Sequence, residues 1–338
     1  MRADRSGQIL LAHGSGGRLT QQLVDSVFAR GLSNPILVRM EDAATLDFQG
    51  RLACTIDSHV VSPLFFPGGD IGRLAVTGTV NDLAVAGAEP MHLTAGFIIE
   101  EGFAFHDLER IVESMSEAGA EAGTDIIAGD TKVVEKGAAD GVFVTTCGIG
   151  RVPDGVDISA AGARPGDAVI VSGTIGDHGI TVLSQREGIG VATGLVSDCA
   201  PLWPLVRDML AAAPGIRVMR DPTRGGLAAT LNEIAQASGV AIEIDEAAIP
   251  YRTEVRSACE LLGLDPLILA NEGKLVAVMA QEDTEAVLAA MRSNPHGRDA
   301  ALIGRVEAAA APRVHARTLI GSRRVISMPT GEQLPRIC

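Results

Sequence analysis

Short apolar runs alternate with amphipathic helical segments along the whole chain, and this alternation limits the fold more than any other sequence feature. Leu52–Ile56, Ala168–Val171 and Val240–Ile244 are apolar runs typical of strands. Residues 72–87 and 226–235 carry apolar side chains at helical spacing instead. Because both patterns occur in both halves, the sequence predicts a mixed α+β fold rather than an all-helical or all-strand one.

A cluster of glycines and prolines at residues 151–166 divides the chain. With 338 residues, the chain is long enough for two domains that each bury a core. We therefore predict an N-terminal domain over residues 1–155 and a C-terminal domain over residues 156–328. Residues 329–338 contain two prolines and no apolar periodicity, and we expect them to form a mobile tail.

The charge balance argues against several classes of partner. Acidic side chains outnumber basic ones by 42 to 28, so no basic face is expected for nucleic acid or for a membrane surface. No apolar segment approaches the length of about 20 residues that spans a bilayer. The N-terminus carries no apolar signal core, so we expect a cytoplasmic protein.

Four aspartates stand beside turn residues in the first half, at the predicted ends of strands or helices: Asp42, Asp57, Asp82 and Asp130. Mg²⁺ prefers oxygen ligands and commonly shares one or two carboxylates with a substrate phosphate. Such aspartates are therefore candidates for a site that holds a metal ion and a phosphate. Each one, taken alone, is equally typical of a turn or a helix cap.

Two further segments of the first half are compatible with phosphate binding. The loop His13–Gly17 precedes a predicted helix and would offer backbone N–H groups, although it matches no established nucleotide motif. Gly129–Val133, predicted as a loop between two strands, places Lys132 two residues after Asp130. A flexible loop and a solvated lysine remain equally good explanations.

The second half offers three polar segments. In Asp221–Gly226, Arg224 would direct its guanidinium to a phosphate or carboxylate. In Asn271–Lys274, Glu272 precedes a strand and would serve as a general base if it were partly buried, with a plain turn as the alternative. His178, in Gly176–Gly179, is more typical of a structural histidine than of a catalytic one.

The chain ends in Cys338, and no core requires a cysteine at the end of a tail. Residues 329–338 would reach about 30 Å when extended, so they can carry a thiol between a partner and the chain's own site. Arg336 is expected to favour the nucleophilic thiolate. Cys54 and Cys147 lie in apolar runs and are expected to pack, and the five cysteines include no paired metal-binding spacing.

Together these segments resemble the HypE family of hydrogenase maturation factors, which are carbamoyl dehydratases. The resemblance extends from about residue 8 to the last residue. It is carried by His13–Gly17, Thr55–Val60, Gly78–Leu83, Gly129–Val133, Gly176–Gly179, Arg220–Gly226, Asn271–Lys274 and the closing Pro335–Cys338. The aspartate motifs also occur in aminoimidazole ribonucleotide, selenophosphate and thiamine monophosphate enzymes. The ending Pro-Arg-Ile-Cys distinguishes this family from them.

The resemblance implies the two-domain fold of aminoimidazole ribonucleotide synthetase (PurM-like), a homodimer through the N-terminal domains, and an ATP site. Cys338 would receive a carbamoyl group from the carbamoyltransferase HypF and be dehydrated with ATP to an S-cyanated cysteine. The cyano group would pass to iron on a HypC–HypD complex. A related selenophosphate synthetase-like enzyme and a non-catalytic thiol carrier are the alternatives, although a selenophosphate enzyme would need a reactive residue near the first glycine loop.

The resemblance also assigns roles to individual residues. The chemistry is assigned to Cys338, Glu272, Lys132, Arg224 and Asp221. Binding of the nucleotide is assigned to Asp42, Asp57, Asp82, Asp130, Gly16, Gly17, Asn81 and Thr131. The Mg²⁺ ligands among these are Asp42, Asp82 and Asp130.

Overall fold

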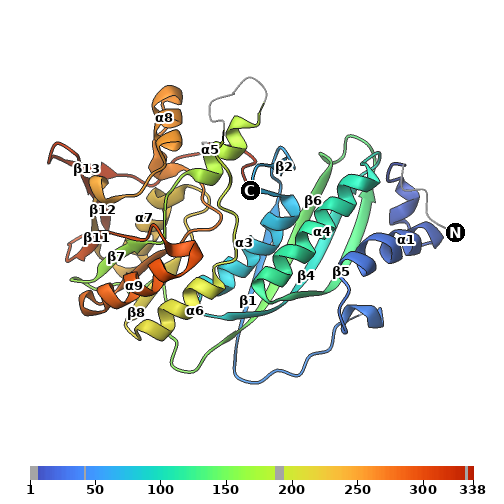
Figure 1. Cartoon of the computed structure of the whole chain (residues 1–338), viewed down its shortest axis with the longest axis horizontal. Helices are drawn as coiled ribbons and strands as arrows, with labels where there is room; N and C mark the ends of the chain where they lie inside the picture. The colour runs from blue at the N-terminus through green and yellow to red at the C-terminus, as the bar shows by residue number, and fades with distance from the viewer. Residues whose placement is uncertain (1–6, 42, 187–193, 332–333) are drawn as a thin grey trace.

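Two β-sheets organise the chain, one in each of the halves that the sequence separates (Figure 1). The computed structural model describes residues 7–41, 43–186, 194–331 and 334–338. The first half contains α1 (Arg18–Leu23), the π-helical segment η2 (Val24–Phe28), α2 (Ala29–Gly31), β1 (Arg51–His59), β2 (Phe65–Phe66), β3 (Gly69–Asp70), α3 (Ile71–Val85), β4 (Glu89–Glu100), α4 (Phe105–Ala122), β5 (Asp125–Val134) and β6 (Val142–Val152).

The second half contains shorter strands and more helices. Its elements are β7 (Ala168–Val171), α5 (Asp177–Ser184), α6 (Trp203–Ala212), β8 (Ile216–Arg220), α7 (Gly226–Ser238), β9 (Ala241–Asp245), α8 (Thr253–Leu262), β10 (Val276–Met279), α9 (Thr284–Ser293), β11 (Ala301–Glu307), β12 (Arg313–Arg317) and β13 (Arg323–Ile326). The prediction of a mixed α+β fold is confirmed. No helix in the described part of the chain is long and apolar enough to cross a membrane.

The first sheet has the strand order β1-β6-β4-β5, and α3 and α4 pack side by side on one of its faces (Figure 1). Helix α4 buries the apolar stripe that the sequence predicts, with Leu108, Ile111 and Met115 fully buried against α3 and the sheet. Helix α3 begins at Asp70, whose carboxylate accepts hydrogen bonds from the backbone N–H groups of Gly72 and Arg73 at 2.7 and 2.9 Å.

No helix of the described chain covers the opposite face of this sheet. Leu52, Ile56 and Ile98 point to that face and are 54%, 70% and 44% exposed. Cys54 and Cys147 lie there as well, with their Sγ atoms 3.8 Å apart, so the expectation that they pack within the core is wrong for a single chain. Successive side chains of a strand point to opposite faces, and these residues alternate with the buried ones. An apolar face of this kind is typical of an interface.

The second sheet has the strand order β13-β12-β9-β11-β7-β10-β8, and its strands β7, β10 and β8 are covered on both faces. Along β7, Val169 and Val171 join the core formed with α7, whereas Ile170 joins the core formed with α6 and α9. A central strand buried on both faces needs a continuous apolar sequence. This requirement explains why the apolar run predicted at Ala168–Val171 coincides with the observed strand.

Three of the predicted turn aspartates lie within regular elements instead. Asp57 is in β1, Asp82 is in α3 and Asp130 is in β5. The prediction of a loop at Gly129–Val133 is wrong, because these residues pair with Ala95–Ile99 of β4 in parallel register. Strand β5 is at the edge of the sheet, where polar side chains are tolerated, and this masks its strand character in the sequence.

Candidate active site

Four carboxylates converge where the two halves of the chain meet. Asp57 and Asp82 come from β1 and α3 of the first half, and Asp221 and Glu272 come from loops of the second half. The Thr55 hydroxyl donates to Oδ2 of Asp82 at 2.7 Å, which fixes this carboxylate beside β1. The side chain of Asn81, the residue before Asp82, donates to the carbonyl oxygen of Glu272 at 3.0 Å, which joins α3 to the Glu272 loop. Burial raises the pKa of both Asp221 and Glu272, and the negative charges of Asp57 and Asp82 add to this effect.

Electrostatics in this cluster favours the protonated carboxyls. Burial, reinforced by the nearby charge of Asp82, raises the pKa of Asp221 to about 7. Burial also raises the pKa of Asp82, against the opposing effects of the Thr55 hydrogen bond and of Arg220 and Arg224. Carboxylates that are crowded and desolvated in this way gain most from a cation or an incoming proton. Such perturbation is typical of a functional site.

Glu272 is the most enclosed member of the cluster. Glu272 is 3% exposed, and its Oε1 atom has no hydrogen-bond partner within the described structure. Burial, together with the charges of Asp198 and Asp221, raises the pKa of Glu272 well above its ordinary value. The backbone N–H of Glu272 donates to Oδ1 of Asp198 at 3.1 Å, and the other oxygen of Asp198 lies 3.2 Å from Nζ of Lys274. Glu272 is therefore held in place by its loop, and its Oε1 atom remains without a hydrogen-bond partner in the described chain.

Asn81 is used differently from the prediction. Its side chain is 1% exposed and donates to the carbonyl oxygens of Ala200 and Glu272 at 3.1 and 3.0 Å. Its Oδ1 atom accepts from the backbone N–H of Leu202 at 2.8 Å. The amide is thus committed to protein contacts and has no open face for a nucleotide. It joins α3 to the Glu272 loop and supports the carboxylate cluster.

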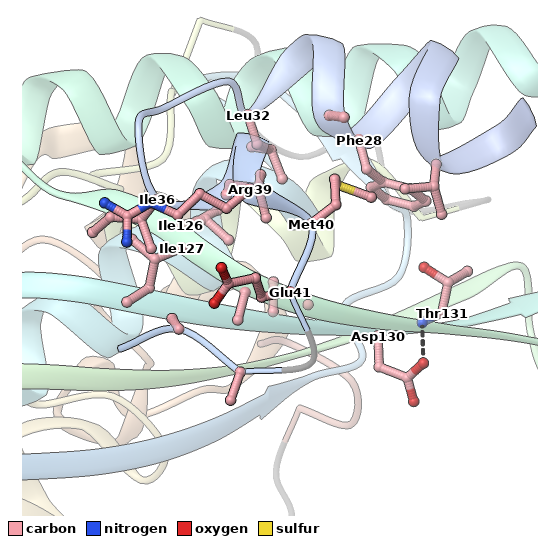
Figure 2. Close-up of a pocket in the computed structure, with 18 of the residues that line it drawn as sticks. Phe28, Leu32, Ile36, Arg39, Met40, Glu41, Ile126, Ile127, Asp130 and Thr131 are labelled. Atoms are coloured by element: carbon pink, nitrogen blue, oxygen red, sulfur yellow. Dashed lines mark hydrogen bonds between the residues drawn. The ribbon is translucent and has the colours of Figure 1, made fainter. Parts of the chain in front are cut away.

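A second polar group lies on the edge strand β5. Nζ of Lys132 lies 2.7 Å from Oδ2 of Asp130, and both side chains are largely exposed. This lysine lowers the pKa of Asp130 by a direct hydrogen bond. Asp130 and Thr131 lie at one side of a pocket of about 240 Å³. Figure 2 shows the walls of this pocket, which include Phe28 and Ile126, with Glu41 opposite the β5 strand.

The two groups lie at opposite edges of the first sheet. Asp82 is fixed beside β1, and Asp130 is on β5, three strand spacings away in the order β1-β6-β4-β5. With about 4.8 Å between neighbouring strands, one chain cannot bring both to a single Mg²⁺ ion, whose ligands lie about 2.1 Å from it. Asp82 and Asp130 of one chain therefore do not meet at one ion, and the predicted metal set of Asp42, Asp82 and Asp130 stays a prediction. Asp42 itself lies outside the described residues.

The loop His13–Gly17 leads into α1 as predicted, but one of its donors is already used. The backbone N–H of Gly16 donates to Oγ1 of Thr20 at 2.9 Å, and Gly16 adopts a left-handed φ of 82°. A Cβ atom on Gly14 would approach the backbone nitrogen of Val133 to 2.5 Å. Glycine there allows the loop to pack directly against β5, near the Asp130–Lys132 pair.

The C-terminal tail is docked at the junction of the two halves, where Figure 1 marks the C-terminus beside β2. The backbone N–H groups of Val60 and Ser62 donate to the carbonyl oxygens of Cys338 and Arg336 at 3.3 and 3.1 Å. Cys338 is half-buried and packs against the core of the first half. The tail thus lies beside the chain that leaves β1, the strand that carries Asp57.

Arg336 anchors this tail through its own side chain. Its guanidinium donates to the carbonyl oxygen of Val60 at 3.0 Å and forms an ion pair with Asp140. The residue adopts a left-handed φ of 54°, which is uncommon for a residue with a side chain. These contacts give Arg336 a docking role, and its expected role in activating the thiol stays a prediction.

Sequence reasoning missed three residues that bear on the site. His59 is buried two residues after Asp57, with 3.6 Å between its Nε2 atom and Oδ2 of Asp57, and the two-residue period of β1 was the available signal. Asp198 and Arg186 lie outside any motif, and only the folded chain brings them to Glu272 and to the tail. Arg224 is exposed at the rim of the cluster. Burial lowers the pKa of His59, and the nearby positive charge of Arg224 lowers it further.

Comparison with known proteins agrees with this architecture. Residues 40–152 match the family "AIR synthase related protein, N-terminal domain", and residues 164–317 match "AIR synthase related protein, C-terminal domain". The chain is 55% identical to carbamoyl dehydratase HypE of Cupriavidus necator, over 99% of this chain and 96% of that protein.

Solved structures agree as well. A crystal structure of the hydrogenase maturation protein HypE in complex with ATP is 50% identical, with a TM-score of 0.94 over 97% of this chain and 99% of that chain. A HypE–HypF complex contains a chain 48% identical to this one, with a TM-score of 0.81 over 93% of this chain and all of that chain. The chain therefore belongs to the HypE family of carbamoyl dehydratases that act in hydrogenase maturation.

Proposed function

We propose that this chain dehydrates an S-carboxamide on its own Cys338 to an S-cyanated cysteine, using ATP, and so supplies the cyanide ligand for the iron of nickel–iron hydrogenase. The observation that carries the proposal is the docked tail. The carbonyl oxygen of Cys338 lies 3.3 Å from the backbone nitrogen of Val60, on the chain that leaves β1 with its Asp57. An intramolecular substrate held in this way reaches a high effective concentration at the site.

The proposed reaction proceeds through a phosphorylated carboxamide. The carboxamide oxygen of the Cys338 adduct attacks the γ-phosphorus of ATP, and the bond between that phosphorus and the bridging oxygen breaks to release ADP. The oxygen then leaves as phosphate while the nitrogen loses both of its protons and the C≡N bond forms. The net change converts the carboxamide and ATP into thiocyanate, ADP, phosphate and a proton.

Glu272 is the base that we assign to the nitrogen protons. Its buried Oε1 atom lacks a hydrogen-bond partner in the described chain. A raised pKa makes the ionised form of a carboxylate a stronger base. Asp221 and Arg224, from the preceding loop, would complete this side of the site.

The cluster also fits a divalent cation. Asp57, Asp82 and Asp221 are crowded carboxylates whose mutual repulsion is relieved by a cation, and oxygen ligands suit Mg²⁺. These residues would hold Mg²⁺, which when bound neutralises charge on the transferred phosphoryl group. Asp82, oriented by Thr55, is the ligand with the best-defined position.

The pocket beside β5 suits the base and sugar of the nucleotide, because its walls are mainly apolar and its rim carries Asp130 and Thr131. Lys132 would neutralise phosphate charge next to it. Since β1 and β5 lie at opposite edges of the sheet, we propose that the apolar sheet face pairs with that of a second copy. In such a homodimer, the acids of β5 in one chain would meet the carboxylate cluster of the other.

The partners that we propose follow from the chemistry of the tail. HypF would load Cys338 with the carbamoyl group, as the HypE–HypF complex of a relative suggests. A HypC–HypD complex would accept the cyano group on its iron. These exchanges need a reduced thiol, which agrees with a cytoplasmic site of action.

The direct test follows the mass of the C-terminal peptide after incubation with HypF, carbamoyl phosphate and MgATP. We expect a carbamoyl adduct first and then a species lighter by one water, both absent from Cys338→Ala. A non-catalytic thiol carrier would give the first species only and would hydrolyse no ATP in response to it. That result would reject the proposed reaction.

A further inference from the structure

The last peptide group of the tail is held in a fully buried position. Ile337 is 5% exposed and joins the core of the first half, although it is the penultimate residue of the chain. Its carbonyl oxygen lies 2.8 Å from Nε2 of His178, and His178 is 0% exposed. His178 belongs to α5 of the second half, so this contact joins the tail to an element that is remote in sequence.

The hydrogen bonds around His178 fix which ring nitrogen carries the proton. The Ile337 carbonyl can only accept, so Nε2 must donate to it. Nδ1 lies 2.8 Å from Oγ of Ser197, and the same hydroxyl also lies 3.2 Å from Sγ of Cys199, so Ser197 orients the ring within a buried polar group of three side chains. Burial lowers the pKa of His178, which agrees with a neutral imidazole. The ring of Phe66 packs edge-on against His178, with 5.5 Å between ring centroids, and further limits its orientation.

Two other side-chain contacts of the described tail are more open to water. In the ion pair with Arg336, the Asp140 side chain is 69% exposed. The Arg186 guanidinium donates to the Pro335 carbonyl at 2.5 Å in an exposed setting. Water can replace such contacts when the tail leaves, whereas a buried donor that loses its acceptor pays the full desolvation penalty. The His178 hydrogen bond therefore depends most strongly on the docked tail.

We propose that His178, oriented by Ser197, is a positioning residue that holds the Ile337 peptide and thereby keeps Cys338 in the site during dehydration. His178 does not touch the reacting sulfur in this role. It acts on the geometry of the tail, through one hydrogen bond to the residue before the cysteine. The effect of His178 on catalysis rests on the proposed dehydration reaction. The docking contact between His178 and Ile337 does not depend on that reaction.

Two substitutions at one position separate the hydrogen bond from the packing. In His178→Gln, the side-chain amide nitrogen can occupy the place of Nε2 and donate to Ile337. In His178→Phe, a ring of similar size remains without a donor. The measurement is the rate at which iodoacetamide alkylates Cys338 in the full chain, followed by the mass of the C-terminal peptide.

We expect His178→Phe to raise this rate at least about tenfold and His178→Gln to leave it near the wild-type rate. Ser197→Ala, which removes the orienting hydroxyl and little volume, is expected to raise it by a smaller factor and serves if His178→Phe does not fold. Equal Cys338 rates in wild type, His178→Phe and Ser197→Ala would overturn the proposal.

Turnover supplies a second readout that a merely structural role would not give. We expect HypF to carbamoylate the released tail, so His178→Phe should be carbamoylated at least as fast as wild type. Its dehydration kcat is expected to fall about tenfold while the KM for ATP is unchanged, with rescue in His178→Gln. Equal dehydration kcat in wild type and His178→Phe would overturn the proposal. If wild type itself fails to dehydrate the adduct, the reaction is rejected while the alkylation result still decides the role of His178.

Discussion

The backbone N–H of Val60 donates to the carbonyl oxygen of Cys338 across 3.3 Å. Val60 directly follows β1, and Asp57 lies three residues earlier on that strand. The residue that we assign as reaction platform is thus aligned with a strand that contributes to the carboxylate cluster. The position of β1 therefore determines both where the tail docks and where Asp57 lies.

Replacing Glu272 by glutamine removes the proposed base and keeps the size of the side chain. We expect Glu272→Gln to bind ATP and to accept the carbamoyl group, but to form the cyanated tail about 10² to 10⁴ times more slowly. Mass spectrometry of the C-terminal peptide over time measures this rate. Glu282→Gln, at an exposed glutamate, is the matched control and should behave as wild type. A normal rate of cyanation in Glu272→Gln would exclude Glu272 as the base.

The raised pKa of Asp221 predicts how stability depends on pH without metal. The carboxyl has a pKa of about 7 in the folded chain and about 3.9 when unfolded, so the folded state binds the proton more tightly. Stability from this group is therefore fully present below about pH 4 and is lost as pH rises towards 7, by at most about 1.4 kcal/mol per pH unit.

Thermal unfolding in chelator at several pH values measures this dependence. Asp221→Asn should flatten the decline of Tm between pH 5 and pH 7, and Asp299→Asn, at an exposed aspartate, should leave it unchanged. An identical pH dependence in wild type and Asp221→Asn would show that Asp221 ionises normally.

Thr55 offers a test of the metal assignment that leaves every carboxylate in place. Its hydroxyl donates to Asp82 at 2.7 Å, and loss of such a supporting hydrogen bond typically weakens a metal ligand about 10- to 100-fold. We expect Thr55→Val to raise the Mg²⁺ concentration needed for half-maximal ATP hydrolysis by about tenfold, and Asp82→Asn to raise it further. An unchanged Mg²⁺ requirement in both variants would remove Asp82 from the metal site.

The apolar face of the first sheet predicts self-association. Ile56 is 70% exposed on this face, so Ile56→Asp is tolerated in a single chain but would bury an unpaired charge in a dimer. We expect this variant to sediment as a folded monomer with little ATP hydrolysis. Leu261→Asp, at a 74% exposed leucine of α8, is the control and should remain a dimer. A fully active monomeric Ile56→Asp would refute the shared site.

The sequence predicted the buried elements best. Ala168–Val171 coincides with β7 because both faces of that strand are buried, which requires an uninterrupted apolar run. The prediction of a loop at Gly129–Val133 fails because β5 is an edge strand with polar side chains. Local patterns report burial directly, whereas pairing along a sheet edge depends on a neighbour that is distant in sequence.

The candidate site shows the same difference between what local motifs predict and what only the folded chain determines. Asp57, Asp82, Asp221 and Glu272 were all candidates from their local motifs, and the fold brings them together. Spacing along the chain could not separate Asp82 from Asp130, because strand order decides their distance. Asp198 could not be predicted, since it becomes relevant only when its carboxylate accepts from Glu272 in the folded chain.

The measurement that tests the central claim most directly is the mass of the tail peptide during a single turnover. Chain already carbamoylated on Cys338 is freed of HypF and then mixed with MgATP. The account predicts that the peptide loses the mass of one water while one ADP and one phosphate form per chain. Release of ADP and phosphate with no loss of water from the Cys338 adduct would contradict it.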